Sequence, residues 1–338
     1  MTEANEQRAV SITIDGRSVS VPAGSTILQA AERLGIEIPT LCFVEGLPAM
    51  NSCMGCLVKT VETGKFVPAC STAAEDGMAG ESETGEVAEL RREALELLVG
   101  DHLGDCEAPC RLVHPRWLDV PLMIHRIAAG DFAGAAAIAA EHEPVAGDKK
   151  PPYEKACRRG RIDEPVAIER LIDFARSQKP DDSPVDLPAS RPWTVTMGAL
   201  QDEEKELYAQ GARAGGPIVP ASGERYRPEE ARAEAARCLH CDCRGRDECR
   251  LLYWAVRCGA DPKRRRRRDR VYRCDNSHPL LLFEPGKCIR CGLCVHIAAA
   301  AGCAPGMAHL GRGFDGSIEP PFNAALADAL GLAAYAPA

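Results

Sequence analysis

The chain opens with alternating polar and apolar residues, which predict a β-hairpin. The alternation runs over residues 11–15 and again over residues 18–21, and an Asp-Gly pair between them supplies the turn. A helix is predicted next, because Thr26 is followed three residues later by Gln29, as in a capping box. An apolar stripe at helical spacing continues from there and ends at Gly35.

The pattern further along predicts short elements and one linker. Two strands are expected at residues 57–61 and 65–67, on either side of a Thr-Gly turn. Apolar residues at helical spacing predict an amphipathic helix over residues 86–99, and another helix is expected over residues 229–237, after a proline in its first turn. Between residues 177 and 223 the chain is rich in Pro, Gly, Asp and Ala with little periodicity, which is typical of a linker.

Composition narrows the class of protein. Seventeen cysteines in 338 residues is a high content, yet the N-terminus has no charged segment followed by an apolar one. This combination argues against secretion and disulfides and favours metal ligation. The longest apolar stretches, such as residues 132–140, are too short to span a bilayer. A net charge of −8 argues against general nucleic-acid binding. We therefore expect a cytoplasmic protein without membrane insertion.

Four cysteines near the N-terminus have a spacing typical of an iron–sulfur site. Cys42, Cys53, Cys56 and Cys70 stand as C-x10-C-x2-C-x13-C, a close pair flanked by one distant cysteine on each side. Four thiolates at such spacing can close around a [2Fe–2S] cluster, as in plant-type ferredoxins. A zinc ribbon would instead have two separated C-x2-C pairs. Zinc and unrelated thiols remain the alternatives.

The order strand, strand, helix, cysteine loop, strand, strand resembles a β-grasp ferredoxin. Residues 8–85 are similar to the [2Fe–2S] domain of the large iron–sulfur subunit of respiratory complex I and of related hydrogenase and formate dehydrogenase subunits. The resemblance implies that the cysteine loop, with Gly46 and Gly55, wraps the cluster. Its backbone N–H groups would then point at sulfur and tune the reduction potential.

The next segment resembles a helical iron–sulfur domain. Residues 106–110 and 156–168 are similar to the domain at the front of the glutamate synthase small subunit, which dihydropyrimidine dehydrogenase also carries. That family holds two [4Fe–4S] clusters with about eight ligands. Two of its cysteine positions are His114 and Tyr153 in this chain. The resemblance therefore implies that one of the two ligand sets is largely lost.

We expect one cluster in this helical domain. The four ligands that the resemblance implies are His102, Cys106, Cys110 and Cys157. The H-x3-C start is also similar to a [4Fe–4S] segment of complex I, although the next cysteine of that pattern is Arg116 here. Histidine can replace cysteine on iron. The alternative is that both clusters are lost and only the helical packing remains. His114 is the reserve ligand, and His125 is expected to be an ordinary helical residue.

A third cysteine group follows the helix at 229–237. It consists of Cys238, Cys241, Cys243 and Cys249, spaced C-x2-C-x-C-x5-C. Four cysteines within twelve residues can bind one [4Fe–4S] cluster. A four-thiolate zinc site has similar spacing and is the competing interpretation. His240, between the ligands, is expected to face solvent.

The last group is the ferredoxin signature C-x2-C-x2-C at Cys288, Cys291 and Cys294. It again resembles the complex I subunit, whose fourth ligand position is Ala336 in this chain. We predict that Cys303 is the fourth ligand instead. The alternatives are Cys274, His296, or a [3Fe–4S] or labile cluster. Cys258 is expected to be a packed thiol.

The predicted fold class is α+β, with a β-grasp [2Fe–2S] domain, a helical iron–sulfur domain and a small ferredoxin-like C-terminal domain. The expected segments are residues 8–85 ([2Fe–2S] domain), 86–177 (helical [4Fe–4S] domain), 178–224 (linker) and 225–334 (C-terminal iron–sulfur domain). The expected cofactors are one [2Fe–2S] cluster and one to three [4Fe–4S] clusters. No G-x-G-x-x-G stretch follows a predicted strand, so the sequence predicts no FAD or NAD(P) site.

Several clusters without a catalytic triad favour an electron relay. We expect no catalytic residue, and a flavin, hydrogenase or formate dehydrogenase type of partner subunit would supply the chemistry. The basic run at residues 263–268 is interpreted as a solvated loop, a docking patch for an acidic redox partner, or a nucleic-acid contact. An iron–sulfur regulator and a partner-assisted flavoprotein oxidoreductase are the alternative functions.

Overall fold

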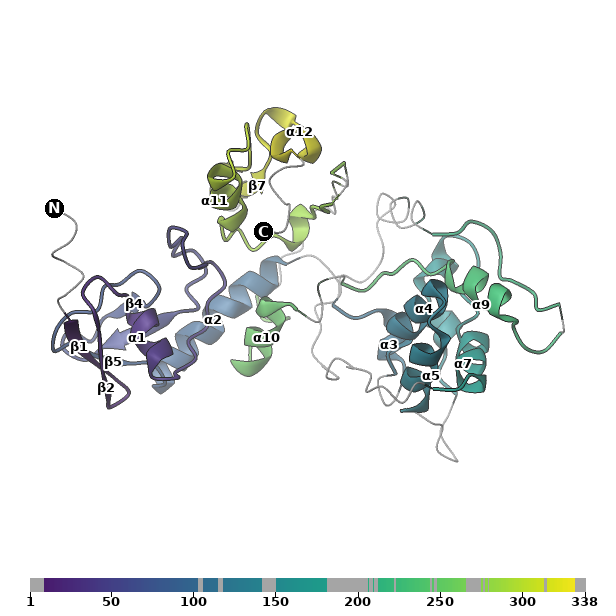
Figure 1. Ribbon diagram of the computed structural model, residues 1–338, viewed down its shortest axis with the longest axis horizontal. Helices are drawn as coiled ribbons and strands as arrows, with labels where there is room; N and C mark the ends of the chain where they lie inside the picture. The colour runs from purple at the N-terminus through teal and green to yellow at the C-terminus, as the bar shows by residue number, and fades with distance from the viewer. Residues whose placement is uncertain are drawn as a thin grey trace. The chain divides into compact units, whose positions relative to one another are not determined.

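The structure is a computed structural model, and it divides the chain into two compact units (Figure 1). Unit 1 comprises Met1–His102 and Cys249–Ala338, and unit 2 comprises Leu103–Glu248. The described residues are 9–102, 106–114, 118–141, 150–180, 206, 209, 212–221, 223–243, 245, 248–265, 275, 277–278, 280–312 and 315–331. The residues between these ranges include most of the predicted linker.

Unit 1 begins with a five-stranded mixed sheet. Its strands are β1 (Ala9–Ile14), β2 (Arg17–Pro22), β3 (Leu57–Thr60), β4 (Phe66–Pro68) and β5 (Ala79–Glu81), in the order β2-β1-β5-β3-β4. The predicted hairpin is confirmed, because β1 and β2 pair antiparallel with Ile14 opposite Arg17. Asp15 and Gly16 form its turn at φ values of 49° and 75°. The sequence pattern did not predict β5, which pairs parallel with β1 and antiparallel with β3.

One short helix packs on this sheet. Helix α1 (Ile27–Arg33) has the predicted capping box, in which the Thr26 side chain and the Gln29 side chain each bond the other residue's backbone N–H. Its buried residues share a core with the sheet, to which Ile12 and Val58 contribute. The mixed sheet with its packed helix is the arrangement of a ferredoxin-type domain. Packing of apolar side chains between the two stabilises the domain.

The remainder of unit 1 combines the predicted amphipathic helix with C-terminal elements. Helix α2 (Gly85–Asp101) is joined to the sheet by buried Arg91, whose Nε and Nη2 donate to the Leu57 carbonyl at 3.1 and 2.7 Å. Buried Glu96 of α2 accepts from the Asp261 backbone N–H at 3.2 Å. The C-terminal elements are α10 (Arg250–Arg257), η2 (Pro285–Lys287), α11 (Leu293–Ala300), β6 (Ala308–Leu310), β7 (Ser317–Glu319), η4 (Pro321–Asn323) and α12 (Leu326–Leu330).

Unit 2 is helical in its described part. Its elements are α3 (Pro109–Leu112), α4 (Val120–Ala129), α5 (Phe132–Ala140), α6 (Tyr153–Ala156), the 3₁₀ turn η1 (Arg158–Arg161), α7 (Ile168–Ser177) and α9 (Pro228–Ala235). Helices α4, α5, α7 and α9 lie together in Figure 1 and share one apolar core. Met123, Leu171 and Phe174 are among its fully or almost fully buried residues. The predicted helix at 229–237 is confirmed, with its bounds at Pro228–Ala235.

Candidate metal centres

The four cysteines of the first set come together in two pairs. Cys42, Cys53, Cys56 and Cys70 are only 1–3% exposed. The Sγ atoms of Cys42 and Cys53 lie 3.3 Å apart, and those of Cys56 and Cys70 lie 3.4 Å apart. Among the described residues, no three Cys, His, Asp or Glu side chains gather as ligands of a single ion. Two sulfur pairs fit the two irons of a [2Fe–2S] cluster better than one tetrahedral zinc ion.

Backbone hydrogen bonds hold this cysteine loop against α1 and the sheet. The first N–H groups of α1, at Ile27 and Leu28, donate to the carbonyls of Thr72 and Ala69, each at 2.9 Å. The Ala69 N–H in turn donates to the Cys56 carbonyl at 3.0 Å. The ligand segments around Cys56 and Cys70 are thereby fixed to each other and to the start of the helix. This arrangement uses the N–H groups that a helix leaves without internal partners.

The two thiols of each pair differ in pKa. The hydrogen bond that Cys42 shares with Cys53 lowers the pKa of Cys42 to about 5, and the one that Cys56 shares with Cys70 lowers the pKa of Cys56 to about 7. The same bonds, together with burial, raise the pKa of Cys53 and Cys70. Within each pair, one thiol therefore loses its proton more readily than the other. Because metals bind thiolates, iron binding must release any proton that remains on these sulfurs.

In unit 2 the structure brings together four cysteines that the sequence pattern assigned to two different sets. Cys110 on α3, Cys157 at the end of α6, and Cys238 and Cys241 after α9 line one pocket. Burial raises the pKa of Cys110 well above its ordinary value and that of Cys238 to about 12. Burial thus favours the neutral thiol over the thiolate at both positions.

The other members of the two predicted ligand sets do not line this pocket; they are His102, Cys106, Cys243 and Cys249. The Cys106 carbonyl accepts from the Cys243 N–H at 3.4 Å within unit 2. His102 and Cys249 belong to unit 1. The Cys249 Sγ caps the N-terminus of α10 by accepting from the Leu252 N–H at 3.4 Å. The proposed ligand roles of these residues remain predictions.

The histidines of unit 2 pack against neighbouring rings. Buried His114 accepts at Nδ1 from the Leu118 N–H at 3.3 Å, and its ring stacks on Tyr153 with centroids 6.0 Å apart. The two rings occupy the positions at which the glutamate synthase resemblance expects cysteines. His240 is half-buried and contacts His125 edge-on at 5.4 Å. The ring of His240, which was expected to face solvent, is thus partly covered by an aromatic partner on α4.

The C-terminal ferredoxin signature folds into a turn in which a backbone N–H group donates to a cysteine sulfur. Arg290, at a φ of 55°, donates its N–H to the Cys288 Sγ at 3.3 Å. Burial raises the pKa of Cys291, and it raises that of Cys294 to about 11. Neighbouring Cys288 raises both pKa values further, because adjacent thiolates repel each other. N–H groups aimed at a thiolate are a usual feature of iron–sulfur ligands.

The predicted fourth ligand of this site lies on the same small core. Cys303 packs with Cys288 and Cys294 against the apolar residues of α11 and α12. Its thiol donates to the Leu330 carbonyl at 2.9 Å. Cys274 and Ala336 lie outside the described residues. Cys258, at the end of α10, is partly buried, and burial raises its pKa, as expected for a packed thiol.

The first and last cysteine motifs lie against each other in unit 1. The Met50 Sδ is 2.7 Å from the His296 Nε2, and the Ser52 Oγ is 3.5 Å from the Cys291 carbonyl oxygen. Gly292 has a φ of 77°, a conformation that favours glycine, and an added Cβ would lie 2.4 Å from the Met50 Cε, so that the Met50 side chain would have to shift. Sequence reasoning missed Met50 and Ser52 because neither is a ligand and no pattern links them to residues about 240 positions away.

Ion pairs also connect α2 to the C-terminal cysteine signature and to the basic run at residues 263–268. Arg290, within the signature, donates to the Asp101 carboxylate at 2.6 Å. Arg264 and Arg265 of the predicted basic run pair with Glu96 and Glu93 of α2. The first arginines of that run therefore contact α2 rather than form an unpaired basic patch. Residues 266–268 lie outside the described part of the chain.

Comparisons with known proteins find relatives of the N-terminal part of the chain. Residues 7–85 match the family described as "2Fe-2S iron-sulfur cluster binding domain". This segment of the chain is a [2Fe–2S]-type domain. The chain is 46% identical over 97 residues to a component of the NADH-quinone oxidoreductase of Rhizobium meliloti, and 44% identical over 102 residues to HndD of the NADP-reducing hydrogenase of Solidesulfovibrio fructosivorans. It is 34% identical over 99 residues to a putative formate dehydrogenase, YrhE, of Bacillus subtilis.

These matches cover only part of each protein. They span 29% of this chain and between 10% and 17% of the relatives' lengths. A solved structure of an NAD+-reducing [NiFe]-hydrogenase in the H2-reduced state aligns with a TM-score of 0.47 at 16% identity, over 96% of this chain and 80% of that chain. The family match and the curated relatives confirm the resemblance of the [2Fe–2S] domain to complex I and hydrogenase subunits. No described helix is long and apolar enough to cross a membrane.

Proposed function

We propose that this chain is an electron-relay subunit of a multi-subunit oxidoreductase in the cytoplasm. The proposal rests on two cysteine pairs, Cys42 with Cys53 and Cys56 with Cys70. Both lie in a domain that matches a [2Fe–2S] family. Such a cluster, when bound, takes up and releases one electron. The chain would hold the cluster, exclude water from it through the burial of all four thiols, and set its potential through nearby N–H groups.

The second step of the relay would be a cluster at the C-terminal signature. Cys288, Cys291 and Cys294 supply three ligands, and Cys303 is the proposed fourth. The contact between Ser52 and the Cys291 carbonyl supports direct transfer between the two centres of unit 1. Adjacent ligand loops would keep the two clusters close, so that electron transfer between them would need no substrate or mobile carrier.

The names of the relatives indicate the kind of partner. They include subunits of an NADH-quinone oxidoreductase and of an NADP-reducing hydrogenase, and a putative formate dehydrogenase. We propose that a flavin, hydrogenase or formate dehydrogenase type of subunit exchanges electrons with this chain. The chain itself would make and break no substrate bonds. Unit 2 would extend the relay or form the surface that meets the partner.

Reduction by different donors tests this proposal. The full chain, purified without oxygen, should be bleached in its visible absorption by dithionite and should remain oxidised with NADH, NADPH, formate or hydrogen alone. The physical reason is that a relay has centres that accept electrons but no site that extracts them from these donors. Bleaching by NADH or NADPH alone, with flavin released on denaturation, would instead support the flavoprotein alternative.

A further inference from the structure

Four thiols in unit 2 form a ligand set that the cysteine spacing does not predict. Cys110, Cys157, Cys238 and Cys241 come from three segments, and all four line one pocket. The remainder of its wall is mainly apolar and includes Pro121, Ile124 and Ile168 of α4 and α7. Cys110 is part of the main core of unit 2, and the other three pack against that core. Four cysteines along the wall of a mainly apolar pocket are a suitable environment for a [4Fe–4S] cluster.

The local backbone at Cys238 matches that of the ferredoxin signature. His240 has a φ of 47° and donates its N–H to the Cys238 Sγ at 3.5 Å. Arg290 has a φ of 55° and makes the same contact with Cys288 at 3.3 Å. Non-glycine residues rarely adopt a positive φ, so this shared conformation needs a cause. A C-x2-C turn shaped to direct an N–H at the first sulfur supplies that cause in both places.

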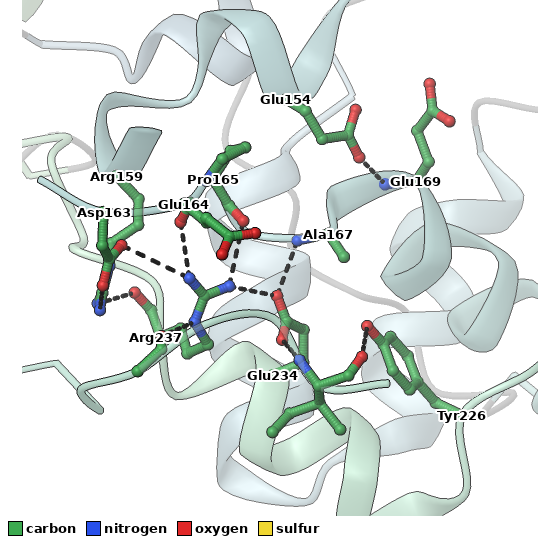
Figure 2. A network of polar contacts seen from close by, with 12 residues as sticks. Glu154, Arg159, Asp163, Glu164, Pro165, Ala167, Glu169, Tyr226, Glu234 and Arg237 are labelled. Atoms are coloured by element: carbon green, nitrogen blue, oxygen red, sulfur yellow. Dashed lines mark hydrogen bonds and ion pairs between the residues drawn. The ribbon is translucent and has the colours of Figure 1, made fainter. Parts of the chain in front are cut away.

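A buried polar network fixes two of these segments to each other (Figure 2). The fully buried Arg237 donates to the carbonyls of Glu164 and Pro165 at 2.6 and 3.1 Å, and it pairs with buried Glu234 at 2.9 Å. Arg159 donates to the Arg237 carbonyl at 2.9 Å. Arg237 directly precedes Cys238, and Arg159 lies two residues after Cys157. The network therefore holds the Cys157 segment against the end of α9.

At the centre of this network is the buried ion pair between Arg237 and Glu234. Removal of one partner from a buried ion pair leaves a charge without compensation, which is strongly destabilising. Glu234 also accepts from the backbone N–H groups of Ala167 and Ile218, at 2.8 and 2.7 Å. The groups around Arg237 and Glu234 in Figure 2 thus contribute to one fixed arrangement of the two cysteine segments. Fixed ligand positions are what a preorganised metal site requires.

We infer that Cys110, Cys157, Cys238 and Cys241 together bind one [4Fe–4S] cluster. The ligands are then all sulfur, and His102, Cys106, Cys243 and Cys249 are not among them. The nearby Arg158, whose Nη1 lies 3.5 Å from the Cys241 carbonyl oxygen, adds positive charge beside the site, and Asp242 on the same wall adds negative charge. This inference deepens the relay proposal and rests on it, since it adds one centre to unit 2.

Single substitutions in the full chain test the ligand set. Each of Cys157→Ala and Cys241→Ala, purified without oxygen, should lose about four irons per chain and one [4Fe–4S] EPR signal, while the [2Fe–2S] signal keeps its intensity. The matched controls are Cys106→Ala and Cys243→Ala, which neighbour the same site and should keep the wild-type iron content. The [2Fe–2S] signal reports that unit 1 is loaded, and far-UV circular dichroism reports that the helices of unit 2 are formed.

The outcomes separate this inference from the relay proposal. Equal iron loss in Cys243→Ala and Cys241→Ala would overturn the ligand set in favour of the local C-x2-C-x-C group. Zinc at this pocket in the wild-type chain, or wild-type iron content in Cys157→Ala, would also overturn it. In each of these cases an intact [2Fe–2S] signal would leave the relay proposal standing. Absence of that signal from wild-type protein would instead contradict the relay proposal.

Discussion

Replacement of Cys56 by alanine is expected to abolish the [2Fe–2S] cluster. Cys56 and Cys70 form one of the two sulfur pairs, so loss of Cys56 leaves one iron with a single protein thiolate. The thiol is 2% exposed, and water cannot readily replace it as a ligand. Iron content should fall by about two per chain, with the [2Fe–2S] EPR signal lost. Metal analysis and EPR of the reduced protein measure both effects.

Cys258→Ala is the matched control for this substitution. Cys258 is also a partly buried thiol of unit 1, but it ends α10 and lies outside every proposed ligand set. Its removal should leave iron content and the EPR spectrum unchanged. An unchanged [2Fe–2S] signal in Cys56→Ala would show that the cluster is held by other residues. That result would contradict the site described for Cys42, Cys53, Cys56 and Cys70.

Replacement of Cys291 by alanine is expected to break the relay after its first centre. Cys291 is the middle ligand of the C-terminal signature, and its carbonyl contacts Ser52 of the [2Fe–2S] loop. The variant should lose about four irons and take up about one electron fewer in a reductive titration, because each cluster accepts one electron. The [2Fe–2S] signal should persist, since its own four thiols are untouched.

Cys303→Ala tests the proposed fourth ligand of the same cluster. If Cys303 is the fourth ligand, its removal should have the same effect as Cys291→Ala, with about four irons and one electron lost and the [2Fe–2S] signal retained. Retention of a four-iron cluster in Cys303→Ala would exclude that role. Cys258→Ala again serves as the control. Loss of the [2Fe–2S] signal in Cys291→Ala would contradict the independence of the two sites.

Local sequence signals predicted the first domain well. The Asp-Gly turn and the Thr26–Gln29 capping box each involve residues within four positions of one another, so propensity and hydrogen bonding decide them locally. Strand β5 was missed for the opposite reason. It has three residues, includes Gly80, and gains its partners from β1 and β3, which lie far away in the chain. No alternation of polar and apolar residues can develop over so short a strand.

The grouping of cysteines was also beyond what spacing could predict. Spacing identifies close pairs such as Cys238 with Cys241, but it does not say which distant thiols join them. In unit 2 that choice is made by tertiary packing, because the network around Arg237 fixes the segment of Cys157 to the end of α9. Arg237 carries no motif, so its importance emerges only from its complete burial and its carbonyl partners.

The most direct test of the account is a count of iron, zinc and acid-labile sulfide in the full chain, purified without oxygen and combined with EPR after reduction. One [2Fe–2S] and two [4Fe–4S] clusters predict about ten irons and as many sulfides per chain, with signals of both cluster types. Zinc in place of iron and an absence of sulfide would contradict the account. So would cysteines of the first set recovered as disulfides from such material.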